Sequence, residues 1–290
     1  MDGVLVVDKP SGPTSHDVVS RARRVFGTRE VGHAGTLDPM ASGVLVLMFG
    51  QACKLSAYLT AQEKRYRAEV HLGRSTDSLD AQGTTTEERQ LAPGWLDADA
   101  LERALSGERA REQQEPPALS ALKVDGVRAY RRARRGESVA LAERRVTVHE
   151  LTLLRASDAT LELELLVSKG YYVRALARDL GRALGVPAHL SLLRRLASGP
   201  FTLADAAGWP LDSASAPMPT AEAAKRALPH ATLTAEGAAR ARTGRALGAE
   251  HFVTDPIDLG AWLAESGELV ALGARDDAGA YRVLRGFAQA

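Results

Sequence analysis

The chain has 290 residues, 45% of them hydrophobic and 25% charged, which predicts one large domain or a large and a small one, with ample apolar residues for a core. Its net charge of +1 excludes a globally basic nucleic-acid binder but allows a basic face that acidic regions elsewhere offset. With Cys53 as the single cysteine, the sequence excludes a disulfide framework and a cysteine-based zinc site.

The first fifty residues alternate strand-like and helix-like segments. The apolar residues 4–7 predict a short strand, which a segment rich in proline and glycine ends. Thr14 or Ser15 then predicts the N-cap of a helix that stops at Gly27. The apolar run 44–49 predicts a buried strand.

The middle of the chain contains strand patterns on both sides of a charged segment. Residues 66–73 alternate apolar and polar side chains and predict a half-buried strand. A helix is expected over 97–106, and strands are expected around 146–154 and 161–167. Between them, residues 107–145 are strongly charged and interrupted by two prolines.

The C-terminal third begins with the stretch 168–185, which runs from a strand into a helix. Residues 205–224 are rich in Ala, Ser and Pro and predict a linker. The last segment, 225–290, has short apolar runs between Gly and Asp and predicts a small β-rich domain. No stretch approaches the roughly 18 apolar residues of a membrane span, and the N-terminus lacks secretory features, so we expect a cytoplasmic protein without a membrane partner.

The loop "GHAGTLDPMASG", residues 32–43, places the carboxylate of Asp38 among small residues just before the buried strand. A carboxylate can act as a base or form a covalent intermediate, and Pro39 holds Asp38 extended. Glycines in the loop permit close approach by a ligand. The alternative is an ordinary turn aspartate, with His33 an ordinary loop histidine, and local sequence alone favours that interpretation.

Other polar residues extend this hypothesis. Arg174 lies at a strand-to-helix junction, where it can neutralise a buried carboxylate, whereas Arg178 and Arg182 are expected on a solvated helix face. Tyr66 opens a strand on its apolar side, so a core tyrosine is the alternative to a functional one.

The charged segment carries five arginines within eight residues and no acid between them. This run favours a phosphate-binding surface over a solvated helix. Its members are Arg128, Arg131, Arg132, Arg134 and Arg135.

Common catalytic motifs are missing. The sequence contains no G-x-x-x-x-G-K-[ST] loop, no G-x-G-x-x-G, no H-E-x-x-H and no G-x-S-x-G, and its histidines lack metal-ligand spacing. These absences favour a reaction without a metal or another cofactor.

Several stretches, in order, resemble the TruB family of tRNA pseudouridine synthases. They are "GVLVVDKPSGPTSHDVV" (3–19), "GHAGTLDPMASGVLVL" (32–47), "KRYRAEVHLGRSTDSLDAQG" (64–83), "PPALSALKVDGVRAY" (116–130), "SKGYYVRALARDLGRALG" (168–185) and "LLRRLASGPF" (192–201). The resemblance implies a cofactor-free isomerase that converts uridine 55 in the T loop of tRNA to pseudouridine by base flipping. It also implies an α+β fold with a mixed, largely antiparallel central sheet.

The resemblance assigns roles residue by residue. It makes Asp38 the catalytic aspartate, stacks Tyr66 on the target uracil and pairs Arg174 with Asp38. The residues that it places at the target nucleotide or its neighbours are His33, Tyr172 and Leu193. Those in matching motifs with a general RNA-binding or structural role are Lys9 and Lys123.

The resemblance also divides the chain. Residues 1–215 match the catalytic domain, with an RNA-gripping insert at about 107–145, and residues 225–290 loosely resemble a small RNA-binding PUA domain. The chain departs from the family at Leu119, where Tyr is usual, and at Tyr171, where Thr is frequent. We expect a monomer whose partner is the T stem-loop of tRNA.

Two other function classes compete. An RNA-binding protein without chemistry, such as a tRNA-folding factor, would use the same tyrosine, arginine and basic insert. It would have little use for Asp38, a carboxylate facing polyanionic RNA. An aspartate-based phosphotransferase would need further acids for a metal near Asp38, and the loop has none. The sequence leaves open whether Asp38 attacks the ribose, attacks the ring or removes a ribose proton.

Overall fold

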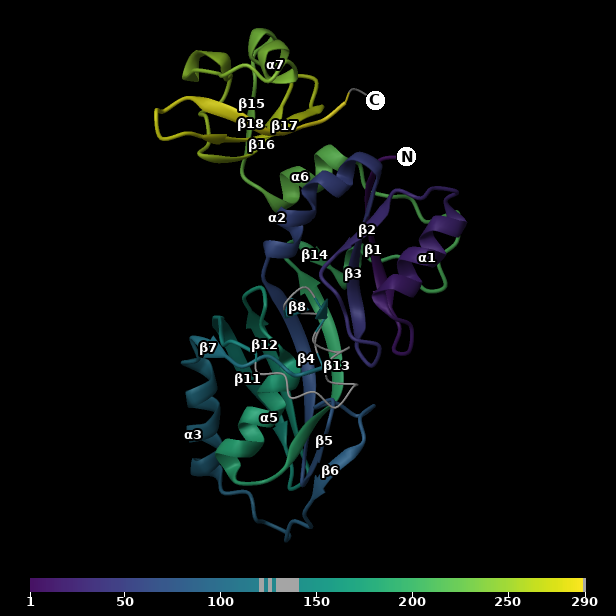
Figure 1. The fold of residues 1–290 in the computed structure, drawn as a ribbon, viewed down its shortest axis with the longest axis vertical. Helices are drawn as coiled ribbons and strands as arrows, with labels where there is room; N and C mark the ends of the chain where they lie inside the picture. The colour runs from purple at the N-terminus through teal and green to yellow at the C-terminus, as the bar shows by residue number, and fades with distance from the viewer. Residues whose placement is uncertain (120–122, 125–126, 129–140, 289–290) are drawn as a thin grey trace.

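The computed structural model describes residues 1–119, 123–124, 127–128 and 141–288. A large sheet runs along the molecule, and a small β-rich unit lies at one end, beyond α2 and α6 (Figure 1). The β-rich C-terminal segment predicted from the sequence is therefore confirmed.

Within the described residues, eight strands form the large sheet: β1 Gly3–Lys9, β2 Val31–Ala34, β3 Ser42–Phe49, β4 Lys64–Leu72, β11 Val148–Ala156, β12 Thr160–Val167, β13 Ala188–Ser198 and β14 Phe201–Thr202. The α-helices are α1 Ser15–Val25, α2 Ser56–Ala61, α3 Ala98–Arg109, α5 Val173–Leu184, α6 Thr220–Ala227 and α7 Ala235–Arg242. Short 3-10 helices are η1 Gly50–Leu55, η2 Leu203–Asp205 and η3 Ala249–His251.

Three two-stranded ribbons and the C-terminal sheet complete the description. The ribbons pair β5 Arg74–Thr76 with β6 Thr85–Glu88, β7 Gln113–Gln114 with β10 Arg144–Arg145, and β8 Lys123–Val124 with β9 Val127–Arg128. The C-terminal sheet has the order β15 His230–Thr232, β16 Leu259–Leu263, β17 Leu269–Arg275 and β18 Tyr281–Gly286.

The large sheet is mixed, as expected. Its strand order is β1-β3-β13-β4-β12-β11, with β2 beside β3 and β14 beside β13. Strands β13 and β3 run parallel, and the other neighbouring pairs are antiparallel. The sheet thus brings β3, which follows the Asp38 loop, next to β13 from late in the chain.

Local sequence explains the helices that flank this sheet. Thr14 and Asp17 form a reciprocal capping box at the start of α1, and Gly185 ends α5 in the left-handed conformation. The apolar faces of α1, α3 and α5 share one core cluster with the sheet. Figure 1 shows α3 and α5 together over the β4, β12 and β11 part of the sheet.

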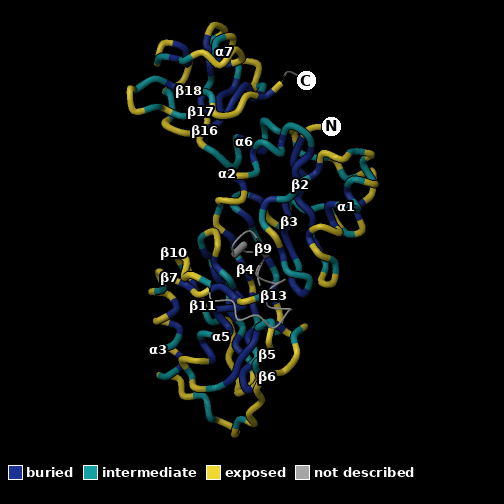
Figure 2. The backbone as a smooth tube through the Cα atoms, in the orientation of Figure 1, coloured by how far each residue is buried: buried dark blue, intermediate teal, exposed yellow. Residues whose placement is uncertain are grey.

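Strands β1 and β3 are buried on both faces, as their unbroken apolar runs predict (Figure 2). One face belongs to the core under α1. The other belongs to a second cluster, which also includes residues of η1, α2, α6 and the C-terminal sheet. Helix α6 contacts both β1 and the strands β16 and β17, so the C-terminal unit is packed against the large sheet through α6.

Two features differ from the sequence-based expectation. Strand β13, central in the sheet, was not predicted as a strand. The segment predicted as a linker, 205–224, is not a free linker: it follows β1, with hydrogen bonds from Asp8 N to Ala207 O (3.0 Å) and from Val4 N to Met218 O (2.8 Å), and it contains the start of α6. The domain boundaries themselves stay a prediction.

Candidate active site

Asp38 lies in the loop between β2 and β3, and backbone contacts fix this loop against the start of α1. The Ser15 hydroxyl accepts from Leu37 N (2.8 Å) and donates to Leu37 O (3.0 Å). Gly12 N donates to Pro39 O (2.8 Å). These bonds hold the residues on both sides of Asp38, so its carboxylate has a defined position.

The buried guanidinium of Arg195, on β13, holds the same loop by hydrogen bonds to backbone oxygens. It donates to Val44 O (2.6 Å), Gly35 O (3.0 Å) and Thr36 O (3.4 Å). Gly43 follows the loop with φ +101°, and a Cβ there would lie 2.8 Å from Arg195 N and closer still to its carbonyl oxygen. Only glycine fits this close pairing of β3 with β13.

Lys9 lies fully buried at the end of β1, and its ammonium contacts backbone. Nζ donates to Pro13 O (2.8 Å) and Pro10 O (2.9 Å). Burial, with the nearby charge of Arg195, lowers the pKa of Lys9 to about 8. The resemblance allowed Lys9 either an RNA-binding or a structural role, and this buried position favours the structural one.

Asp38 and Arg174 form an ion pair across 136 residues of sequence. The Arg174 Nε and Asp38 Oδ2 atoms are 2.8 Å apart, and Nη2 donates to Oδ1 at 3.4 Å. Further donations to Ser78 O (2.9 Å) and Leu119 O (3.1 Å) orient the guanidinium. The arginine side chain is 7% exposed and that of Asp38 is 34% exposed, so the carboxylate is reachable while its partner is not.

A second carboxylate, Asp80, lies near the same arginine, with Oδ2 at 3.8 Å from Arg174 Nε. It is buried, and its Oδ1 accepts from Ser78 Oγ (2.7 Å) and Gln82 N (3.0 Å). Asp80 was not singled out in the sequence, where it has the local setting of a turn residue. Its place in the stretch that resembles the family, "STDSLDAQG", was the available signal.

Tyr66 is buried on the core face of β4. In the register of β4 with β13 it is opposite Arg195, and Leu193 is opposite Ala68 on the same face. Tyr66 and Leu193 belong to the same apolar cluster as Leu37, the residue before Asp38. The structure therefore places both predicted residues in the core, with Tyr66 opposite the arginine that holds the Asp38 loop.

His33 and Tyr172 lie on elements that are far apart in the sequence. His33 lies on β2, partly buried, and burial and the charge of Arg195 lower its pKa, which favours a neutral ring. Tyr172 is the N-cap residue of α5, and its backbone is bonded to the side chain of Gln114. Gln114 was not singled out in the sequence.

Arg178 and Arg182, on α5, were both expected to face solvent, and only one of them does. Arg178 is not solvated: its side chain is 13% exposed, and Nε donates to Asp179 Oδ1 at 2.8 Å. Arg182 is 65% exposed, as expected.

Part of the predicted RNA-binding surface lies outside the described residues. Lys123 and Arg128 pair through their backbones in the β8–β9 ribbon. The remaining arginines of the basic run lie outside the described residues; they are Arg131, Arg132, Arg134 and Arg135.

In the part of the chain that the structure describes, no group of three or more His, Cys, Asp or Glu side chains is placed to hold a metal ion. Nor is any helix there long and apolar enough to cross a membrane.

Two family models match consecutive parts of the chain. The family described as TruB family pseudouridylate synthase (N terminal domain) matches residues 23–173. The family described as tRNA pseudouridylate synthase B C-terminal domain matches residues 174–216.

Individual proteins are similar over most of the chain. The protein named tRNA pseudouridine synthase B in Cutibacterium acnes is 46% identical over 282 residues, covering 95% of this chain and 94% of that protein. The protein of the same name in Thermobifida fusca is 46% identical over 287 residues, covering 93% and 94%. Among solved structures, a chain of a Cbf5-Nop10-Gar1 complex is 27% identical with a TM-score of 0.71, covering 94% of this chain and 78% of that one.

Proposed function

Because the chain belongs to the TruB family of pseudouridylate synthases, we propose that it isomerises uridine 55 in the T loop of tRNA, with Asp38 as the reacting carboxylate. The chain is an isomerase that converts a uridine of tRNA to pseudouridine, in line with the relatives that match it over more than nine-tenths of their length. The assignment of individual residues to steps is our proposal.

The reaction conserves atoms and needs no oxidant or reductant. The glycosidic bond between C1′ of the ribose and N1 of uracil breaks, the ring turns, and a bond forms between C1′ and C5. The proton on C5 is lost and N1 ends protonated, so the product is an isomer of the substrate. A carboxylate that attacks the ribose, attacks the ring or removes a ribose proton must be ionised and within reach.

The observation that carries the proposal is the Asp38–Arg174 ion pair. The Arg174 Nε atom, 2.8 Å from Asp38 Oδ2, places a positive charge directly beside the carboxylate. A negative charge that RNA buries needs such a partner. A protein that only binds RNA has little use for a carboxylate at its RNA-facing surface.

The target base must leave its stack to reach Asp38. Flipping costs a few kcal/mol, and stacking on an aromatic ring returns about 1–3 kcal/mol. Tyr66, buried in the core, supplies that ring in our proposal. His33, Tyr172 and Leu193 then contact the target nucleotide or its neighbours.

The substrate is held, in this proposal, at its T stem-loop by the segment 107–145, to which Lys123 belongs. Lys9 acts indirectly, because its buried ammonium organises the backbone before α1. The C-terminal residues 225–290 serve as a PUA-like RNA-binding unit. We propose a monomer that works in the cytoplasm.

The test is the release of tritium from a tRNA transcript that carries tritium at C5 of uridine, because C5 loses its hydrogen in the reaction. Wild-type protein should release tritium from a transcript with uridine 55 and not from one with cytidine there. Filter binding of both transcripts serves as the control. Binding without release would favour an RNA-binding protein, and release from the cytidine-55 transcript would place the reaction at another uridine.

A further inference from the structure

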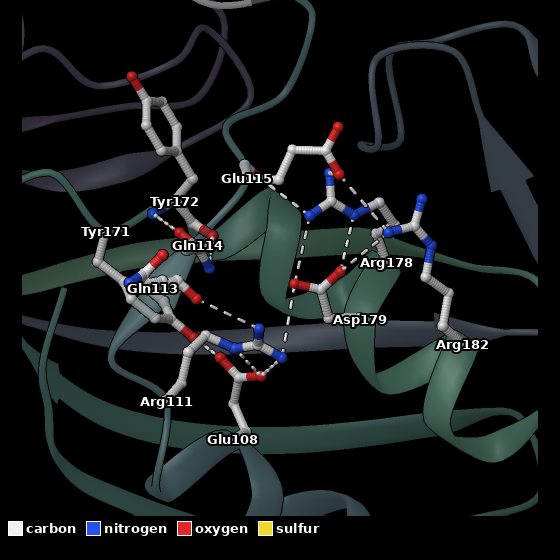
Figure 3. A network of polar contacts seen from close by, with 10 residues as sticks. All are labelled: Glu108, Arg111, Gln113, Gln114, Glu115, Tyr171, Tyr172, Arg178, Asp179 and Arg182. Carbon is white, nitrogen blue, oxygen red and sulfur yellow. Dashed lines mark hydrogen bonds and ion pairs between the residues drawn. The ribbon is translucent and has the colours of Figure 1, made fainter. Parts of the chain in front are cut away.

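The side chain of Gln114 holds both backbone groups of Tyr172, the residue from which α5 begins (Figure 3). Its Oε1 accepts from Tyr172 N at 2.8 Å, and its Nε2 donates to Tyr172 O at 3.2 Å. Gln114 is 1% exposed, on the short strand β7. A buried amide with both ends bonded holds its partner in one geometry.

This contact matters because Tyr172 lacks a cap of its own. It is the N-cap residue of α5, its side chain makes no capping hydrogen bond, and its carbonyl accepts from Ala175 N (3.0 Å) and Leu176 N (3.2 Å). Gln114 therefore fixes the peptide that starts the helix. Arg174 lies two residues further on and points to Asp38.

Further polar contacts join the segment around Gln114 to Tyr171 and to α5. The Tyr171 hydroxyl donates to Glu108 Oε1 at 2.6 Å, and Arg111 Nε donates to Glu108 Oε2 at 2.7 Å. Arg178 donates to Glu115 O at 3.0 Å. The contacts lie on both sides of Gln114 in the sequence, so the segment is clamped to the helix (Figure 3).

The same segment reaches the active site a second time. After Gln114 the chain passes through two prolines, and Leu119 O then accepts from Arg174 Nη2 at 3.1 Å. The arginine is thus oriented both by the start of its helix and by the segment that leads into the insert.

We propose that Gln114 is a positioning residue for the isomerisation, acting through the Tyr172 backbone to place Arg174 against Asp38. The inference rests on the proposed function. Loss of the amide leaves the helix start less defined, so the chemical step slows more than tRNA binding weakens. A small misplacement of a catalytic group can lower a rate about 100-fold.

The experiment compares Gln114→Met, which conserves volume but removes both hydrogen bonds, with Gln114→Ala and with Gln90→Ala, a change at an exposed glutamine outside the segment 107–145. For each folded variant, a single-turnover rate of tritium release and a tRNA Kd are measured. We expect Gln114→Met to lower the rate by about 10–100-fold while Kd changes less than about threefold. Gln90→Ala should match wild type.

A double-mutant cycle with Arg174→Lys separates positioning from a general loss of structure. If Gln114 acts through Arg174, the rate loss caused by Gln114→Met shrinks in the Arg174→Lys background. An equal loss in both backgrounds, an unchanged rate, or a loss confined to Kd would overturn the inference. Wild-type protein without tritium release would instead overturn the proposed function.

Discussion

Replacing Gly43 by alanine tests whether the close contact of β3 with β13 supports the loop of Asp38. At Gly43, φ is +101°, and a Cβ would lie 2.8 Å from Arg195 N. Gly12 offers a matched control, since its φ is +112° and a Cβ there meets nothing within 4 Å. Both substitutions strain the backbone, and only Gly43→Ala creates a clash.

The expected magnitude has two parts. A side chain at such a φ costs about 1–3 kcal/mol, and this part applies to both variants. The clash at Gly43 must also displace the backbone of Arg195, which disturbs the parallel pairing Arg195↔Gly43. Two weakened hydrogen bonds of about 1 kcal/mol each bring the destabilisation by Gly43→Ala to roughly 3–5 kcal/mol.

Equilibrium unfolding in urea measures the difference, with the free energy of unfolding extrapolated to water for each variant. Gly43→Ala should be less stable than Gly12→Ala by about 2 kcal/mol. Equal stabilities would refute the reasoning, because they would mean that β3 and β13 separate without cost.

Three further changes are predicted. Asp80→Asn removes a carboxylate whose Oδ2 atom lies 3.8 Å from Arg174 Nε. It should slow single-turnover tritium release by about tenfold and leave the tRNA Kd unchanged. A wild-type rate would mean that Asp80 is only a structural turn residue. Burial lowers the pKa of Lys9 to about 8, so the unfolded chain binds more protons between pH 8 and 10.5 and stability rises with pH there. Burial lowers the pKa of Lys64 to about 8 as well, so Lys9→Met should reduce that rise, measured by urea unfolding at pH 8, 9 and 10, without abolishing it. An unchanged slope would show that Lys9 contributes nothing to the rise. Tyr171→Phe removes the hydroxyl that donates to Glu108, a buried carboxyl group whose pKa is raised by burial. The change should lower the free energy of unfolding by about 1–2 kcal/mol. An unchanged free energy of unfolding would show that this hydrogen bond does not stabilise the fold.

Much of the fold follows from patterns that local physics explains. Alternation predicted β4 and β12, and the cap at Thr14 predicted the start of α1. Strand β13 was missed because it carries Arg194 and Arg195 in the middle of a sheet, where charged residues are unusual. The buried guanidinium of Arg195 is satisfied by the backbone carbonyls of Gly35 in the Asp38 loop and of Val44 in β3, and sequence periodicity contains no signal for such acceptors.

Some residues of the candidate site could be found from the sequence, and others only from the structure. The resemblance pointed to Asp38 and Arg174, and the structure places them in contact. Asp80 and Gln114 were missed because an aspartate in a turn and a glutamine before two prolines have ordinary local explanations. Their partners lie far away in the sequence, so only the tertiary fold shows what each side chain binds.

The most direct test of this account compares Asp38→Asn with Asp99→Asn, a change at an exposed aspartate in the first turn of α3. Both are assayed for tritium release from the uridine-55 transcript and for tRNA binding. We predict that Asp38→Asn binds tRNA and releases no tritium, while Asp99→Asn behaves as wild type. Tritium release by Asp38→Asn at the wild-type rate would contradict the assignment of the chemistry to this carboxylate.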